Sequence, residues 1–121
     1  MQHQAFPFPH NRLEVFLVAL EMASQAKRVA DRVPRGHRSL ADQLLRSSGS
    51  TVLLIGEGAN RYTAGAKRQR YSEARGECGE VAAAAKLLSV LELVPQEECE
   101  ALLGLAGRVA AMLTRLIRRF A

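Results

Sequence analysis

The positions of the prolines constrain the fold of this 121-residue chain more than any other feature. Prolines occur only at positions 7, 9, 34 and 95, so the stretches 35–94 and 96–121 are free of the residue that breaks helices. Strand signals are weak, because aromatic residues make up 5% of the chain and no alternating apolar run is bounded by turn residues. Apolar residues instead recur every three or four positions, which is typical of amphipathic helices. The sequence therefore predicts an all-α fold.

Helix start and stop signals divide the chain into four helices. Asn11 is the expected N-cap of the first helix, with Glu14 as its partner, and Ser39 is the expected N-cap of the second. Thr63 opens the third helix, and Pro95 suits the first turn of the fourth. Short connections predict an antiparallel up-down four-helix bundle. After an N-terminal segment over 1–11 that we expect to be flexible, the bundle is predicted as one domain over 12–121, with helices over about 12–33, 39–59, 63–93 and 95–120.

Composition and motifs exclude several classes of protein. With 48% hydrophobic and 24% charged residues, the chain is typical of a soluble globular domain. Its longest internal uncharged run, 47–56, is far below the roughly 18 residues that a membrane helix needs, and no signal peptide is recognisable, so we expect a cytoplasmic protein with no membrane partner. No nucleotide-binding, nucleophile-elbow or zinc-protease motif occurs, and no histidine pair has metal-ligand spacing. We therefore predict no enzymatic activity, no metal site and no cofactor.

The second predicted helix carries a run of consecutive apolar residues. Val52, Leu53, Leu54 and Ile55 follow one another, and four consecutive residues cover about 300° of a helix. A bundle core needs one apolar stripe, so this helix is either buried on every side in a monomer or part of a subunit interface. Because a four-helix bundle leaves each helix one outward face, we favour self-association, with Val52, Leu53 and Leu54 as the candidate interface.

Several glycines fall inside the predicted third and fourth helices. Gly76, Gly79, Gly104 and Gly107 each cost about 0.5–1 kcal/mol relative to alanine at a helical position. A close approach of two helix backbones would explain that cost. The spacing leaves open whether such an approach lies inside the bundle or between subunits.

The net charge of +5 suits an anionic partner. Arginines recur on one face of the third helix, where Arg68 and Arg75 are seven residues apart, and on one face of the fourth. Stripes of this kind are suited to a phosphate backbone. The candidate nucleic-acid-binding residues are Arg61, Lys67, Arg68, Arg75, Arg108, Arg115 and Arg119.

Two observations favour a simpler interpretation of the basic stripes. Glu73, Glu77 and Glu80 lie at helical spacing from these arginines, so the third helix is also consistent with a solvated, partly neutralised face. Tyr62 and Tyr71 are the only tyrosines, so stacking on nucleic-acid bases has little support in the sequence.

The segment 46–61, RSSGSTVLLIGEGANR, resembles a known signature. It is similar to the second helix of the small four-helix-bundle proteins encoded within intervening sequences of bacterial large-subunit (23S) ribosomal RNA genes, where the stretch typically reads like RRAAVSIPANIAEGSGR. The pattern continues at Tyr71, Ala74, Gly76 and Glu80, and the segment 112–117, MLTRLI, looks like the closing motif of that family. Within the first segment the matching residues are Arg46, Ser50, Ile55, Glu57, Gly58 and Arg61.

The resemblance implies a four-helix bundle with no known enzymatic activity, assembled as a ring of five copies. It also implies a relation to the accessory variability determinant of diversity-generating retroelements, a basic ring that engages a reverse transcriptase and nucleic acid. Val52 and Leu54 depart from the pattern, which commonly has proline and asparagine there. We expect Glu57 and Glu80 to be paired or to lie at helix ends. The signature residues carried over as structural are Arg46, Ser50, Glu57, Gly58, Gly76 and Glu80.

Two hypotheses on function follow from these observations. The leading hypothesis is a non-enzymatic homo-oligomer whose basic helix faces bind RNA or DNA. The alternative is a protein–protein adaptor or assembly module that binds no nucleic acid directly. Salt-dependent binding to nucleic acid separates the two, because phosphate contacts release counterions.

Overall fold

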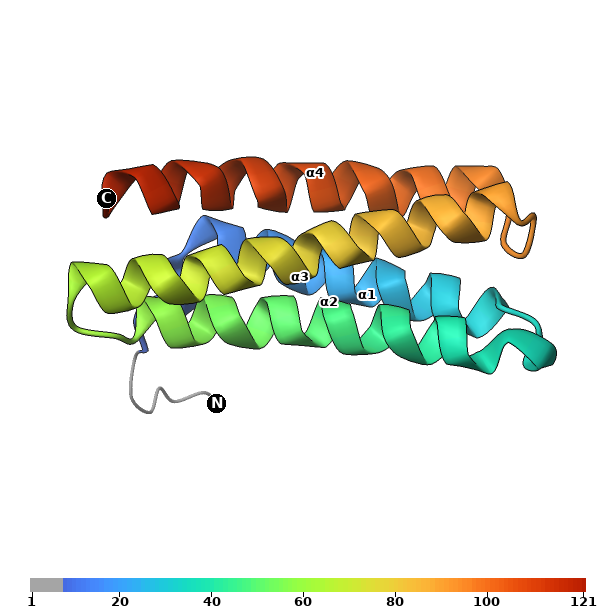
Figure 1. Ribbon diagram of the computed structural model, residues 1–121, viewed down its shortest axis with the longest axis horizontal. Coiled ribbons are helices and arrows are strands. Elements are labelled where there is room, and N and C mark those ends of the chain that lie inside the picture. The colour runs from blue at the N-terminus through green and yellow to red at the C-terminus, as the bar shows by residue number, and fades with distance from the viewer. Residues whose placement is uncertain (1–7) are drawn as a thin grey trace, which may run out of the picture.

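A computed structural model describes residues 8–121, which form four long helices (Figure 1). No strand occurs in this described part, so the prediction of an all-α fold with four helices is confirmed. Most of the N-terminal segment expected over 1–11 lies outside the described residues. In chain order the elements are the 3-10 turn η1 (Pro9–Arg12), α1 (Glu14–Arg32), the 3-10 turn η2 (Arg35–His37), α2 (Arg38–Ala59), α3 (Ala64–Val90) and α4 (Gln96–Arg119).

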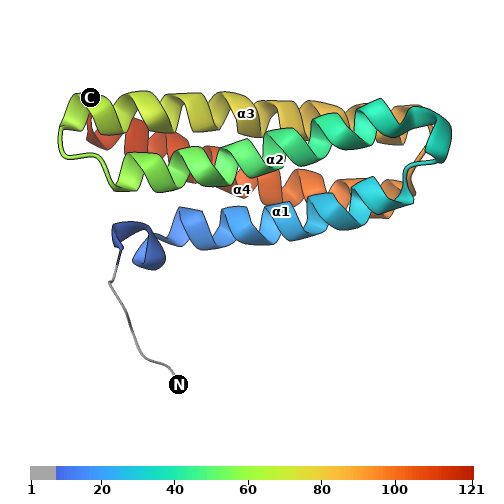
Figure 2. The same cartoon turned by 90° about the horizontal axis from the view of Figure 1, so that it is seen from below.

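The four helices lie side by side, and each packs mainly against two neighbours. α2 packs against α1 and α3, and α4 packs against α3 and α1. The turn from α2 to α3 lies at one end of the molecule, beside the C-terminus, whereas the connections from α1 to α2 and from α3 to α4 lie at the other end (Figures 1 and 2). We call the first of these the Phe120 end. It brings together the end of α2, the turn 60–63, the start of α3 and the end of α4.

The core lies between the helices and takes one apolar stripe from each of them. Its largest fully buried side chains include Ile55 of α2, Leu88 of α3 and Leu113 of α4. Thr51 is buried in the same region, where its hydroxyl donates to the carbonyl oxygen of Ser47 at 2.8 Å. This bond satisfies the polar group locally, so Thr51 is accommodated without a partner from another helix.

Both cysteines are free thiols buried in the core. Burial raises the pKa of the Cys78 thiol to about 11, against the opposing effect of Arg75. Burial also raises the pKa of Cys99, with Glu98 and Glu100 acting in the same direction. Because the thiolate is the reactive form, both side chains behave as small apolar groups at neutral pH.

Two of the expected N-caps are wrong. α1 is capped by Leu13 with no side-chain bond, because Asn11 lies inside the turn η1. α2 begins at Arg38 with His37 as its N-cap, because η2 runs directly into the helix and leaves Ser39 within its first turn. The cap of α3 is as expected: the Thr63 hydroxyl oxygen accepts a hydrogen bond from the Ala66 amide at 3.1 Å.

α3 ends three residues before the predicted limit near 93. The Leu93 amide donates to the Leu88 carbonyl oxygen and the Glu92 amide to the Ser89 carbonyl oxygen, both at 3.0 Å. This pair of bonds is the Schellman motif, which requires a left-handed residue, and Glu92 takes that conformation with a φ of 59°. Apolar residues continue past Val90 because they pack on the bundle end, so periodicity alone extends the helix too far.

Candidate nucleic-acid interface

Basic residues of α3 lie against the second half of α4. The Arg68 guanidinium donates from Nη1 to the Phe120 carbonyl oxygen at 2.7 Å. About two turns further along α3, Arg75 donates from Nε to the Thr114 hydroxyl at 2.7 Å. Both arginines of the predicted α3 stripe are therefore fixed along the seam between α3 and α4, which we call the arginine seam.

The predicted stripe of α4, which we call the α4 stripe, consists of Arg108, Arg115 and Arg119. Arg115 and Arg119 are exposed, and they line a cavity of about 230 Å³ toward α1 with Leu13, the residue before α1, and Glu14 of α1. Arg108 is also exposed, about two turns before Arg115 and nearer the middle of α4. Six of the seven predicted residues thus lie in the half of the bundle nearer the Phe120 end, and Arg108 lies nearer the middle of α4.

The positive charge of these arginines is not consumed by ion pairs of the fold. Among residues 8–121, the ion pairs engage Lys27, Arg32, Arg61 and Arg70, and none involves the arginine seam or the α4 stripe. A guanidinium carries five N–H donors. Because the fold uses one donor each of Arg68 and Arg75, the remaining donors are free to meet phosphate oxygens.

Lys67 has a different position from the other candidates. Its Nζ donates to the carbonyl oxygens of Gly58 at 3.3 Å and Ala59 at 2.9 Å, and it lies 5.8 Å from the centre of the Phe120 ring. A cation at the last carbonyls of a helix stabilises the helix dipole. Lys67 therefore joins the start of α3 to the end of α2, and it adds to the positive charge of the Phe120 end.

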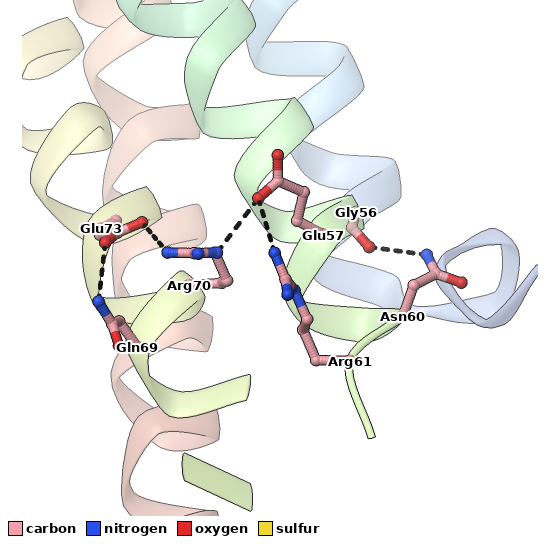
Figure 3. Close-up of polar contacts among 7 residues, drawn as sticks. All are labelled: Gly56, Glu57, Asn60, Arg61, Gln69, Arg70 and Glu73. Atoms are coloured by element: carbon pink, nitrogen blue, oxygen red, sulfur yellow. Dashed lines mark hydrogen bonds and ion pairs between the residues drawn. The ribbon is translucent and has the colours of Figure 1, made fainter. Parts of the chain in front are cut away.

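Glu57 is held between two arginines at the contact of α2 with α3 (Figure 3). Its Oε1 lies 3.2 Å from Arg70 Nε and 3.8 Å from Arg61 Nη2. Arg70 also bonds Glu73 from Nη1 at 2.8 Å, so it bridges acids on both helices. Arg70 was not singled out in the sequence, although its position three residues before Glu73 is a signal for this pair.

Glu80 joins the same two helices further along. Its Oε1 accepts hydrogen bonds from Gln43 Nε2 and from the Ser47 hydroxyl, both at 3.0 Å. Of the roles expected for these acids, Glu57 is ion-paired in the last turn of α2, whereas Glu80 is hydrogen-bonded to neutral side chains in the middle of α3. Within the described chain, no group of three or more metal-ligating side chains lies close enough together to hold a metal ion.

Gly58 is needed because α2 and α3 approach closely at its position. A Cβ atom there would lie 2.6 Å from Cε1 of Tyr71, well inside van der Waals contact. Tyr71 is buried, and burial raises the pKa of its hydroxyl, with Arg119 acting in the opposite direction. Of the other signature residues, Arg46 is exposed, Ser50 is half-buried and Gly76 faces open space.

The sequence model of the 23S rRNA-intervening sequence protein family matches residues 11–115. The chain belongs to that family. A crystal structure of a protein of unknown function from the S23 ribosomal protein family of Bacteroides thetaiotaomicron has the same fold, with a TM-score of 0.80 over 85% of this chain and 97% of that chain at 20% identity. No curated protein matches the chain.

In this member of the intervening-sequence family, the apolar run of α2 divides between the core and the surface. Val52 is only 9% exposed and belongs to the core, so it is unsuited to a subunit interface. Leu54 is half-buried against the core, whereas Leu53 is 69% exposed. α2 packs against both α1 and α3. The monomer therefore buries a wider part of the circumference of α2 than a single apolar stripe.

The helical glycines of this family member face outward. A Cβ atom added to Gly76, Gly79, Gly104 or Gly107 would find no heavy atom within 4 Å. Close packing inside the bundle therefore does not explain these four residues. It explains Gly58 alone among the helical glycines, since Gly56 has an ordinary contact of 3.8 Å with the Phe16 ring.

The two tyrosines have opposite environments. Tyr71 is buried beside Phe120, with ring centres 6.1 Å apart, and Tyr62 is fully exposed in the turn 60–63. The predicted helix bounds already separate the two, because Tyr62 lies between the helices predicted over 39–59 and 63–93, and Tyr71 lies within the second of them. Asn60 and Thr63, two residue types typical of helix ends, mark the turn around Tyr62.

Proposed function

We propose that this chain is a non-enzymatic, homo-oligomeric helical-bundle protein that binds nucleic acid, RNA or DNA, through the arginine seam and the α4 stripe. The observation that carries the proposal is that Arg68 and Arg75 of α3 lie against α4, which itself carries the exposed Arg115 and Arg119. Their charges are free of ion pairs within the described residues.

The distribution of charge along α4 supports a phosphate-binding surface. Glu97 and Glu98 lie in the first turn of the helix, and Arg118 and Arg119 lie in the last. Along α4, positive charge is therefore concentrated toward the Phe120 end. A concentrated field of one sign attracts a polyanion and accelerates its association. Arginine is also the residue best suited to bidentate phosphate contacts.

Self-association is the second part of the proposal. We take the subunit to be an antiparallel up-down bundle and the assembly to be a ring, of five copies as the family resemblance suggests, in the cytoplasm. Leu53 is an exposed apolar residue on an outward face, and the outward glycines of α3 and α4 have no neighbour in the subunit. Both features are explained if another copy covers them.

The first test is binding to a labelled RNA hairpin and a DNA duplex at several salt concentrations. The variant Arg75→Glu/Arg115→Glu changes one arginine of each helix, neither of which lies in the core. The wild type is expected to lose affinity steeply with salt. The variant is expected to bind more weakly at every salt concentration, with a salt slope shallower by about 1 unit for each phosphate contact removed.

A matched control reverses the same amount of charge at the opposite end of the bundle. Arg28→Glu/Arg38→Glu changes two exposed arginines of α1 and α2, and binding is expected to stay close to that of the wild type. Equal loss in both variants would mean that only net charge matters and would contradict a defined surface. A wild type that binds neither probe at low salt would contradict nucleic-acid binding altogether.

The second candidate function is an adaptor that binds another protein without nucleic acid. The exposed Leu53, on a face with no partner in the described chain, is the observation that favours it. This candidate predicts that neither nucleic acid binds at low salt while the protein still self-associates.

A further inference from the structure

Tyr62 is a large aromatic side chain whose ring is not buried within the subunit. It is fully exposed at the tip of the turn 60–63, at the Phe120 end of the bundle. A tyrosine ring is among the largest sources of contact energy in proteins, both in cores and at interfaces. A fully exposed tyrosine ring beside a basic surface is therefore suited to a ligand that packs against a flat ring.

The turn that carries Tyr62 is anchored on both sides. Asn60 Nδ2 donates to the Gly56 carbonyl oxygen at 2.7 Å, which closes the end of α2. The Thr63 hydroxyl caps α3 through the Ala66 amide at 3.1 Å. Because both neighbours are fixed, the ring is presented from an anchored backbone, and a ligand that stacks on it has mainly the Tyr62 side chain left to order.

Basic residues flank Tyr62 on both sides along the chain. Arg61 precedes Tyr62 in the turn, and Arg68 follows it in the second turn of α3. The bond from Arg68 to the Phe120 carbonyl oxygen places the end of α4, with Arg118 and Arg119, beside the same region. Glu57 is shared by Arg61 and Arg70 and offsets part of the positive charge of Arg61 (Figure 3). Arg68 takes part in no ion pair within residues 8–121, so a phosphate on that side of a stacked base would meet positive charge.

We propose that Tyr62 is a stacking platform for an unpaired base, so that the ligand of the basic surface contains a single-stranded segment. This inference rests on the proposed nucleic-acid binding and names the class of nucleic acid. In a duplex each base is covered by its neighbours, whereas a single strand offers both faces of its bases. An aromatic ring flanked by cations is the arrangement that non-sequence-specific single-strand binding uses.

The test compares Tyr62→Ala with the matched control Tyr62→Phe, which keeps the ring and removes the hydroxyl. Affinities are measured for an unstructured single strand, a duplex of equal length, and a single strand that lacks its bases. Tyr62→Ala is expected to weaken binding of the normal single strand by roughly 5- to 100-fold for one lost stacking contact, with an unchanged salt slope. Binding of the duplex and of the abasic strand is expected to stay unchanged, and Tyr62→Phe is expected to bind like the wild type.

A direct optical readout is available because the chain has no tryptophan. Tyr62→Trp creates a single fluorophore at the turn, and its emission is expected to be quenched by the normal single strand and not by the abasic strand. If the wild type binds single strand and duplex while Tyr62→Ala changes neither, the stacking inference fails and the proposed function stands. If the wild type binds no nucleic acid at low salt, both fail.

Discussion

At the scale of single residues, Gly58 is the glycine at which an added side chain would be accommodated worst. α2 and α3 approach so closely there that the ring of Tyr71 occupies the space of a side chain. The sequence resemblance singled out Gly58 as structural without a reason, and the contact with Tyr71 supplies one. Tyr71 in turn packs against Phe120, so the ring cannot move aside without disturbing the end of α4.

Gly58→Ala is expected to lower the free energy of unfolding by about 1–3 kcal/mol, because the added methyl group overpacks a buried site. Gly56→Ala is the matched control, two residues earlier in the same helix. Its Cβ would make only an ordinary contact, so it is expected to be neutral or to stabilise by up to about 1 kcal/mol. Urea unfolding followed by circular dichroism measures both. Equal effects of the two substitutions would contradict the special role of Gly58.

At the scale of helices, the ends and the outward faces were hardest to predict from the sequence. The 3-10 turns η1 and η2 displace the expected caps, and the Schellman motif ends α3 early. Both depend on how the chain enters and leaves the bundle. The outward glycines of α3 and α4 also act on whole helices, because each of them weakens its helix and gains no contact within the subunit.

Gly104→Ala is expected to stabilise the isolated subunit by about 0.5–1 kcal/mol, because alanine restricts the unfolded chain and meets no neighbour in the fold. Thermal unfolding at low protein concentration measures this effect. Repeating the measurement at high concentration adds the contribution of any assembly. A loss of stability that grows with concentration would show that the outward face of α4 is buried between copies, and a loss at low concentration would contradict its exposure in the subunit.

At the scale of the whole molecule, the four helices bury one stripe each and still leave Leu53 exposed. Leu17 and Leu20 of α1 are also about half-exposed on the neighbouring helix. α1 packs against α2, so exposed leucines lie on two adjoining helices. Exposed leucines on adjoining helices support self-association more directly than the consecutive apolar run in the sequence did.

Leu53→Asp is expected to dissociate the proposed oligomer into a helical monomer, because a charge at an apolar interface loses its hydration on assembly. Light scattering measures the mass, against 13.2 kDa for one chain, and circular dichroism checks that the helices persist. Leu87→Asp, at an exposed leucine of α3, is the matched control and is expected to leave the mass unchanged. A wild type that is monomeric at micromolar concentration would contradict self-association.

The candidate surface was predicted residue by residue but not as an arrangement. Arg68 and Arg75 share a helix face by their spacing alone, and the same holds for Arg108, Arg115 and Arg119. Spacing within one helix carries no information on which faces of two helices adjoin. The bonds of Arg68 to Phe120 and of Arg75 to Thr114 place the α3 arginines against α4, whose Arg115 and Arg119 lie on the side toward α1.

The sequence by itself determined the helical class and the number of helices, because proline positions and three-to-four-residue periodicity act locally along the chain. The expectation for Glu57 and Glu80 came from the family resemblance. Only the tertiary structure decided that Val52 is core while Leu53 is surface. These two residues are chemically alike and adjacent in the sequence. Their environments differ because burial depends on which neighbouring helix covers each direction around the helix axis, and packing between distant segments sets that.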